Sequence, residues 1–155
     1  MEVEFHRLEK TYAGLRIPDA PRIARLVAAL CEHGQQQPVL VVRANGIDAG
    51  VERYVLIDGY ARVAALGALK RDSTEATLLD LSEADALVLA FRVERNRVRS
   101  AIEEGWLLRE LIEAHAIAQR ALGSLLGRSP SWVARRLALI AVLPAVAEEA
   151  VRGGT

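Results

Sequence analysis

The 155-residue sequence is poor in cysteine, in aromatic side chains and in net charge. Its single cysteine, Cys31, cannot form an internal disulfide, and we expect it to be a small buried hydrophobe within a helix. The 20 basic residues balance the 20 acidic ones, which excludes a bulk polyanion-binding surface and restricts any nucleic-acid contact to a local patch. The three histidines, at positions 6, 33 and 115, are scattered without metal-ligand spacing, so we assign no metal site.

The sequence also lacks any apolar run near the ~20 residues that a membrane-spanning helix needs. Its first ten residues contain acids where a secretory signal would be basic and then apolar. We therefore expect a cytoplasmic protein without membrane contact. The hydrophobic content of 52% is sufficient for a real core, in one domain or in two small domains packed together.

The order of the apolar patterns predicts an α+β fold in which strands and helices precede a helical C-terminal part. Apolar residues in the segment after Ser82 suggest an inward face of Ala86, Leu89, Ala90 and Val93. The expected strands are residues 2–8, 38–43, 54–57 and 77–81, and the expected helices in this part are 21–34, 60–69 and 82–99.

Residues 119–140 are expected to form two helices joined by a glycine turn, and they are the segment around which the chain is organised. Leu122, Leu125 and Leu126 are predicted to form the apolar face of the first helix. Gly127 can adopt the left-handed conformation that commonly ends a helix, and Ser129 is a suitable N-cap for the second helix. Before this segment, a capping box of Ser100 and Glu103 opens another amphipathic helix.

Positive charge without acids makes the two-helix segment a candidate DNA-binding motif. From residue 114 to 147 the chain has arginines at 120, 128, 135 and 136 and no Asp or Glu. A pair of bundle helices with solvated arginines is the alternative interpretation, and DNA binding is the one we favour. The expected DNA-contacting residues are Gln119, Arg128, Ser129, Ser131, Trp132, Arg135 and Arg136.

A second candidate site lies where the strand at 54–57 passes through Gly59 into a helix. This arrangement places backbone N–H groups and the positive end of a helix dipole at one point, where anions bind, and Arg62 follows one turn later. Taken alone, the pattern also fits a tight turn with a surface arginine. Four arginines at 92, 95, 97 and 99 form a further cluster that either an anion or solvent must screen.

Four segments in this order resemble the ParB-type chromosome and plasmid partition proteins of bacteria, including their KorB and Noc relatives. HGQQQPVLVVR (33–43) is similar to the family's glutamine-proline strand segment, and LIDGYARVAAL (56–66) to its GERR phosphate motif. RNRVR (95–99) is similar to its ENxxR motif, and LGSLLGRSPSWVARRLALIAVLP (122–144) to its helix-turn-helix. The resemblance covers nearly the whole chain.

The resemblance implies a small mixed-sheet domain of the ParB/sulfiredoxin type over residues 1–99, which binds CTP, with Mg²⁺ expected beside it. It further implies an all-α helix-turn-helix domain over residues 100–155. Gly59 would hold phosphate through its N–H, and Arg62 through charge-assisted bonds. The nucleotide-binding residues that the resemblance implies are Gln37, Pro38, Gly59, Tyr60, Arg62, Arg95, Asn96 and Arg99.

Two departures from the family pattern bear on turnover. Tyr60 and Ala61 stand where the family has Glu and Arg. Arg95 stands where ENxxR has the Glu associated with metal and hydrolysis, and Glu94 would be rotated by about 100° on a helix. We therefore expect nucleotide binding with weak or absent hydrolysis, and we assign no catalytic residue.

The resemblance also implies partners. A ParB-type protein would bind a palindromic site in double-stranded DNA as a clamp-like homodimer, associated with the nucleoid or a plasmid, and would act with a partition ATPase. The chain stops before the position of the family's C-terminal dimerisation domain.

Two other functions remain open from the sequence. One is a transcriptional regulator or adaptor that keeps the fold without binding nucleotide, which the altered phosphate motif favours. The other is an enzyme on the same scaffold, such as a sulfiredoxin, a kinase or a nuclease. Sulfiredoxin would need a cysteine in the phosphate motif, where this chain has Tyr60 and Ala61.

Overall fold

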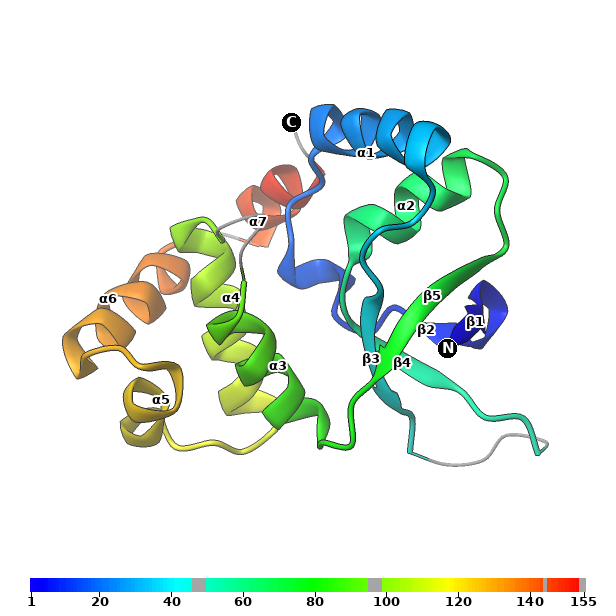
Figure 1. The fold of residues 1–155 in the computed structure, drawn as a ribbon. Helices are drawn as coiled ribbons and strands as arrows, with labels where there is room; N and C mark the ends of the chain where they lie inside the picture. Colours follow the sequence, from blue (N-terminus) through cyan, green and yellow to red (C-terminus); the bar gives the residue numbers. More distant parts are fainter. Residues whose placement is uncertain (46–49, 95–98, 144, 154–155) are drawn as a thin grey trace. The chain divides into compact units, whose positions relative to one another are not determined.

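The structure, a computed structural model, describes residues 1–45, 50–94, 99–143 and 145–153 (Figure 1). The chain forms two compact units, each of which is described by itself. Unit 1 comprises Met1–Ala13 and Pro18–Ala86, and unit 2 comprises Gly14–Ile17 and Leu87–Thr155. A mixed sheet with helices, followed by helices alone, confirms the α+β prediction. The functional boundary expected between residues 99 and 100 stays a prediction.

Unit 1 is built on a five-stranded sheet of order β1-β5-β3-β4-β2. The central strand β3 (Val39–Arg43) pairs antiparallel with β4 (Tyr54–Asp58) and parallel with β5 (Ser73–Leu78). The edges are β1 (Glu2–Glu4), antiparallel to β5, and β2 (Leu8–Glu9), parallel to β4. The sheet is therefore mixed, as expected.

Two strand predictions were wrong in detail. The expected strand 2–8 is interrupted by the 3₁₀ turn η1 (Phe5–Arg7), which sends β1 and β2 to opposite edges of the sheet. The fourth predicted strand, 77–81, was placed too late, since β5 starts at Ser73. Buried and outward-facing residues alternate along β5. The buried residues in its first half are Thr74 and Ala76, which give little apolar signal in the sequence.

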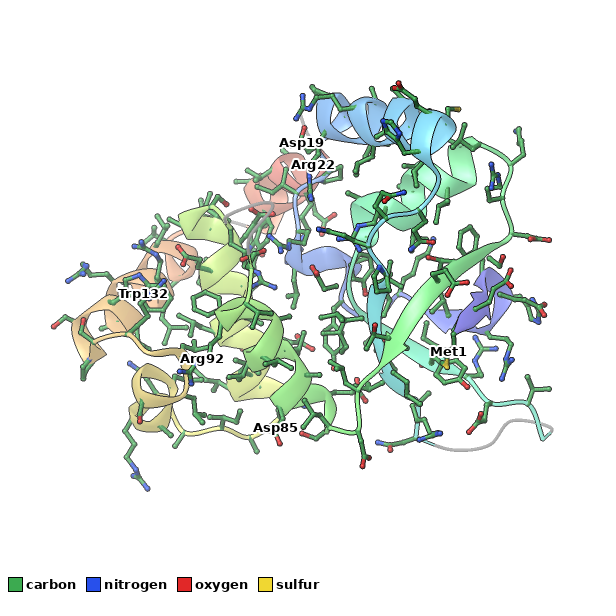
Figure 2. The ribbon with its side chains drawn as sticks, in the orientation of Figure 1. Met1, Asp19, Arg22, Asp85, Arg92 and Trp132 are labelled. Carbon is green, nitrogen blue, oxygen red and sulfur yellow. The ribbon has the colours of Figure 1, made fainter. Side chains whose placement is uncertain are left out.

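Two helices form successive layers on this sheet, as Figure 1 shows. Val63 of α2 (Tyr60–Ala68) is buried in the core formed by the sheet. Leu30 of α1 (Ala20–His33) is buried with Ala65 and Leu66 of α2. The side chain of Asp19 caps α1 by accepting the Arg22 N–H at 3.1 Å, and both residues are labelled in Figure 2.

The prediction that Cys31 is buried was wrong, because this side chain is exposed. Cys31 follows the buried Leu30 by one position, which turns it about 100° around the helix axis, away from the stripe that faces α2. The helix itself was predicted correctly, and only the side of it on which the cysteine lies was not.

Unit 2 contains the second half of α3 (Glu83–Arg92) and four further helices. These are α4 (Ala101–Glu113), α5 (Gln119–Leu126), α6 (Pro130–Ala141) and α7 (Ala145–Arg152). The expected capping box at the start of α4 is present: the Ser100 hydroxyl accepts the Glu103 N–H at 3.2 Å. The buried core of this unit includes Trp106, Leu107, Leu108, Leu111, Leu122, Leu126, Val133 and Ile140.

Three sequence expectations fail in unit 2. The helix expected to reach Arg99 ends at Arg92, so Arg99 precedes α4 as an irregular residue. Val93 therefore lies outside the inward face and is 47% exposed, while Leu87 and Phe91 are buried in its stead. Leu125 is 39% exposed, because α5 turns Leu122 and Leu126, one full turn apart, toward the core.

A short strap, Gly14–Ile17, packs within unit 2 although its neighbours in sequence belong to unit 1. Arg16 forms an ion pair with Glu94, and the Ile17 N–H donates to Glu103 Oε2 at 2.8 Å. Arg152 Nε donates to the Gly14 carbonyl at 2.9 Å. The strap is thus fixed by α4, by α7 and by the segment after α3.

Within the described ranges, no helix combines the length and apolar character that crossing a bilayer requires.

Candidate functional sites

The turn from β4 into α2 forms the first candidate site, and Gly59 determines its shape. Gly59 has a φ of 111°, which disfavours any side chain, and a Cβ there would lie 2.4 Å from Val39 Cγ1. The close approach brings the first turn of α2 against the start of β3, just after Gln37 and Pro38. Because Gly59 has no side chain to cap α2, the first N–H groups of the helix are available to an anion.

Arg62 extends from α2 across the same turn. Its Nη1 donates to the Pro38 carbonyl at 2.9 Å and to the Gln37 carbonyl at 3.4 Å, and its Nη2 donates to Gln37 Oε1 at 3.4 Å. Burial lowers the pKa of Arg62, and the nearby Asp58 charge opposes that shift, so the guanidinium stays charged at neutral pH. The structure therefore brings together four residues of the predicted nucleotide site: Gln37, Pro38, Gly59 and Arg62.

Tyr60 has a structural role that the sequence did not indicate. Its hydroxyl donates to the Leu56 carbonyl at 2.8 Å and accepts the Tyr12 N–H at 3.1 Å. Burial raises the pKa of Tyr60 above its ordinary value, so the phenol is neutral. The side chain therefore faces the interior of unit 1, and the backbone N–H is the part of Tyr60 that could meet a ligand.

Of the remaining predicted nucleotide residues, Arg95, Asn96 and Arg99, the structure describes Arg99. Arg95 and Asn96 fall outside the residues that the structure describes. Arg99 belongs to unit 2, where it is 6% exposed and its Nη1 lies 3.4 Å from Glu94 Oε2. Since Glu94 also pairs with Arg16, its carboxylate is held between two guanidinium groups. A role of Arg99 in the nucleotide site stays a prediction.

The second candidate site is the turn between α5 and α6 (Figure 1). Gly127 ends α5 in the left-handed region with a φ of 68°, as expected. Ser129 caps α6 by accepting the Trp132 N–H at 3.1 Å, and Pro130 occupies the first helical position. The geometry is that of two helices joined by a tight turn, with the capped N-terminus of α6 next to Arg128.

The predicted DNA-contacting residues differ in accessibility. Arg128, Ser129, Ser131, Arg135 and Gln119, the first residue of α5, are exposed. Arg136 and Trp132 are partly buried. Arg136 Nε forms an ion pair with Glu104 Oε1 of α4 at 3.2 Å, so one of the four arginines is neutralised by an acid outside the acid-free segment. The cationic character of this surface therefore comes mainly from Arg120, Arg128 and Arg135.

Sequence reasoning missed Phe91 and Arg92 at the end of α3. Arg92 Nη1 donates to the Leu125 carbonyl at the end of α5 at 3.3 Å, and the Phe91 ring contacts Arg128 and Trp132. Figure 2 labels Arg92 and Trp132. Phe91 is one of only two phenylalanines in the chain. That scarcity was the available signal, but its partners are not evident before the helices are folded.

No group of three or more His, Cys, Asp or Glu side chains is arranged to hold a metal ion among the described residues.

Sequence comparison identifies relatives of this chain. A sequence model of the ParB N-terminal domain family matches residues 1–93. The nucleoid occlusion protein of Bacillus licheniformis is 32% identical over 132 residues, which is 84% of this chain and 44% of that protein. The chain thus spans less than half the length of the relatives it matches.

Two solved structures share the fold. Both are of the C-terminally truncated chromosome-partitioning protein ParB from Caulobacter crescentus. The complex with CTP-γ-S has a TM-score of 0.51 at 22% identity and covers 99% of this chain and 84% of that one. The complex with the centromeric parS site has a TM-score of 0.52 at 20% identity and covers 99% and 78%.

Proposed function

This chain belongs to the ParB N-terminal domain family, and we propose that it is a CTP-binding, site-specific DNA-binding protein of the ParB type. The observation that carries the proposal is the Gly59 turn, where Arg62 and the free end of α2 meet in a chain that also has an arginine-bearing helix pair. Its proposed cellular role is DNA partition or a related clamp or regulatory function, in association with a nucleoid or plasmid.

The donor set of unit 1 fits a triphosphate. The Gly59 and Tyr60 N–H groups would bind phosphate oxygens at the positive end of α2, and Arg62 would add charge-assisted bonds. Gln37 and Pro38 already hold the Arg62 guanidinium by three contacts, which orients it before a ligand arrives. Bound Mg²⁺ would neutralise part of the triphosphate charge. In full, the proposed nucleotide residues also include Arg95, Asn96 and Arg99.

We propose that hydrolysis is weak or absent. Arg95 stands where the family motif has the Glu associated with hydrolysis. The adjacent Glu94 forms ion pairs with both Arg16 and Arg99. A carboxylate whose oxygens are already held by two guanidinium groups is a poor metal ligand. Phosphate release measured with and without bound DNA checks this point, and turnover well above the background rate would contradict it.

The α5–α6 pair supports DNA binding. Arg128 and Arg135 are both exposed, the first directly before the N-cap of α6 and the second on α6 itself, as in a recognition helix that meets phosphates and base edges. In the proposed assembly, two copies of the chain bind the two halves of a palindromic site as a clamp, and a partition ATPase is a further proposed partner. Ser129 caps the helix through its hydroxyl, so its proposed contact with DNA would use the same oxygen or its backbone.

One observation favours a second candidate function, a DNA-binding regulator without nucleotide. The Asp58 charge acts on Arg62 from the last position of β4 and would repel an incoming phosphate. If this repulsion outweighs the attraction of Arg62 and the helix end, the turn is only structural. Which of the two functions applies therefore depends on whether Arg62 and the N-terminus of α2 attract a phosphate more strongly than Asp58 repels it.

A thermal-shift panel of CTP, UTP, ATP and GTP with Mg²⁺ tests the proposal. We expect CTP to raise the melting temperature in proportion to the logarithm of its concentration, because a ligand at one hundred times its Kd stabilises a protein by about 2.7 kcal/mol. Arg62→Ala should abolish the shift, whereas Arg71→Ala, three residues after the last residue of α2, should preserve it. If none of the four nucleotides changes the melting temperature and the protein still binds DNA, the regulator without nucleotide is the correct function.

A further inference from the structure

Two aromatic rings meet at the turn between α5 and α6. The ring centres of Phe91, from the last turn of α3, and Trp132, from the first turn of α6, are 6.1 Å apart and tilted by 59°. Phe91 is 9% exposed, so its ring is fixed in the core of unit 2 while one side remains open to Arg128. The pair thus forms an aromatic contact beside the turn.

Arg128 contacts both rings of this pair. Its Cζ lies 5.4 Å from the centre of Phe91 and 5.5 Å from the centre of Trp132. With the rings 6.1 Å apart, the three centres form a nearly equilateral triangle. The guanidinium therefore contacts both rings from one side and is not enclosed between them, which leaves its outer N–H groups accessible. A cation in contact with two ring faces is attracted by both quadrupoles.

Two other arginines contact the same rings but differ from Arg128 in their charge balance. Arg136 lies 5.2 Å from Trp132 and is paired with Glu104, and Arg99 lies 5.8 Å from Phe91 and is paired with Glu94. No described carboxylate lies within ion-pair distance of Arg128. Of the three guanidinium groups at the rings, that of Arg128 is thus the one whose charge remains available to an external anion.

The position of Arg128 adds a second attraction for an anion. The residue directly precedes Ser129, the N-cap of α6, and so lies at the positive end of the helix dipole. Arg92, beside Phe91, donates to the Leu125 carbonyl at 3.3 Å and so fixes the end of α5 on the other side of the turn. The last turn of α3 therefore supports the turn between α5 and α6 from both sides.

We infer that Phe91 and Trp132 are positioning residues that hold Arg128 as the principal phosphate-binding arginine of the DNA surface. The inference rests on the proposed DNA binding and gives Trp132 a role through Arg128, not through DNA itself. A surface arginine normally loses side-chain freedom when it binds. Because the rings already restrict the Arg128 side chain, less freedom is lost when it meets a phosphate.

The test is a fluorescence anisotropy titration of the full chain with a short mixed-sequence DNA duplex at several salt concentrations. Arg128→Ala should lower the slope of log affinity against log salt by about 1, as expected for one phosphate contact. Trp132→Leu and Phe91→Leu should each weaken binding by about two- to fivefold, the range for loss of one cation–π contact. Trp132→Phe, which keeps a ring, should restore most of the affinity.

The double variants separate positioning from a general structural effect. In the Arg128→Ala background, Trp132→Leu should have no further effect on affinity, whereas in the Arg120→Ala background its full effect should remain. Arg120 is the matched control because it is an exposed arginine on α5 without a ring contact among the described residues. If Trp132→Leu fails to fold by circular dichroism, Phe91→Leu carries the same comparison.

An equal loss in both backgrounds, or no loss in the unmodified protein, overturns the inference while leaving the proposed function intact. An unmodified protein that binds no duplex overturns the proposed DNA binding and this inference with it.

Discussion

The conformation of Gly59 places the first turn of α2 against β3, and a single methyl group should disrupt it. Gly59→Ala would put a Cβ at 2.4 Å from Val39 Cγ1 on a residue with a φ of 111°. We expect the free energy of unfolding to fall by about 2–4 kcal/mol, since backbone strain and overpacking each cost about 1–3 kcal/mol. Urea denaturation followed by circular dichroism measures the change.

Gly67→Ala is the control for that experiment. Gly67 lies in the same helix, and a Cβ there would meet no atom within 4 Å. The substitution should leave the protein unchanged or stabilise it by up to about 1 kcal/mol, because alanine is the better helix former. Equal stability of the two variants would show that Gly59 is not strained and that the turn can relax.

Individual residues mark the limit of what the sequence could predict in the two sites. The glycine-centred turns were predicted because left-handed positions demand specific residues. The ion pair between Arg136 and Glu104 was not, because the acid lies 32 positions earlier, outside the acid-free segment 114–147. The hydrogen bond between the Tyr12 N–H and the Tyr60 hydroxyl was not predicted for a similar reason, since Tyr12 comes from a distant loop.

At the scale of elements, the N-cap of α6 should contribute measurably to stability. Ser129→Ala removes the acceptor of the Trp132 N–H, and we expect the free energy of unfolding to fall by about 0.5–2 kcal/mol. Ser131→Ala, an exposed position two residues later, should change it by less than about 0.5 kcal/mol. Thermal or urea denaturation checks both, and similar losses in the two variants would argue against a specific capping role.

The attachment of α7 to α4 should depend on pH. Glu148 accepts from Arg109 Nη1 and Nη2, both at 3.1 Å, and these hydrogen bonds lower the pKa of its carboxyl below the ordinary 4.5. A depressed pKa stabilises the folded state above the ordinary value, and this contribution is lost as the pH falls through the folded value. Glu148→Gln should therefore reduce stability at pH 7, and the difference from the unmodified protein should shrink below about pH 4.5.

The neighbouring Glu149 provides the comparison for that pH series. Its side chain is 76% exposed and pairs with Arg152 at 3.3 Å, so Glu149→Gln should have little effect on stability at any pH. Urea midpoints measured between acidic and neutral pH test both variants. A Glu148→Gln difference that is independent of pH would show that the carboxyl contributes by packing and not by its charge.

Elements with a clear period or cap were predicted well, and those defined by tertiary contact were not. The helices α1, α4, α5 and α6 follow from caps and apolar spacing in the sequence. The separation of β1 from β2 does not, because strand pairing with β5 and β4 decides it. The early end of α3 could not be predicted either, since the segment after it is rich in arginine, which is a good helix former.

At the scale of the whole chain, two compact units share one polypeptide that passes from one to the other three times. The strap Gly14–Ile17 makes its hydrogen bonds and its ion pair within unit 2, although it joins two parts of unit 1. A cut between residues 99 and 100 would therefore separate the strap from its partners Glu103 and Arg152. The family could be recognised from the sequence because the resemblance rests on four segments in a fixed order. Changes of single residues within a segment leave that order recognisable.

The central claim is that this chain reads a specific DNA sequence, and selection from a random pool of DNA duplexes tests it most directly. The full chain, with CTP and Mg²⁺ present, should enrich a palindromic sequence within a few rounds, because two copies would read symmetric half-sites. Enrichment should fail for the variant carrying both Arg128→Ala and Arg135→Ala. If the unmodified chain enriches no sequence above the starting pool, the account of its function is contradicted.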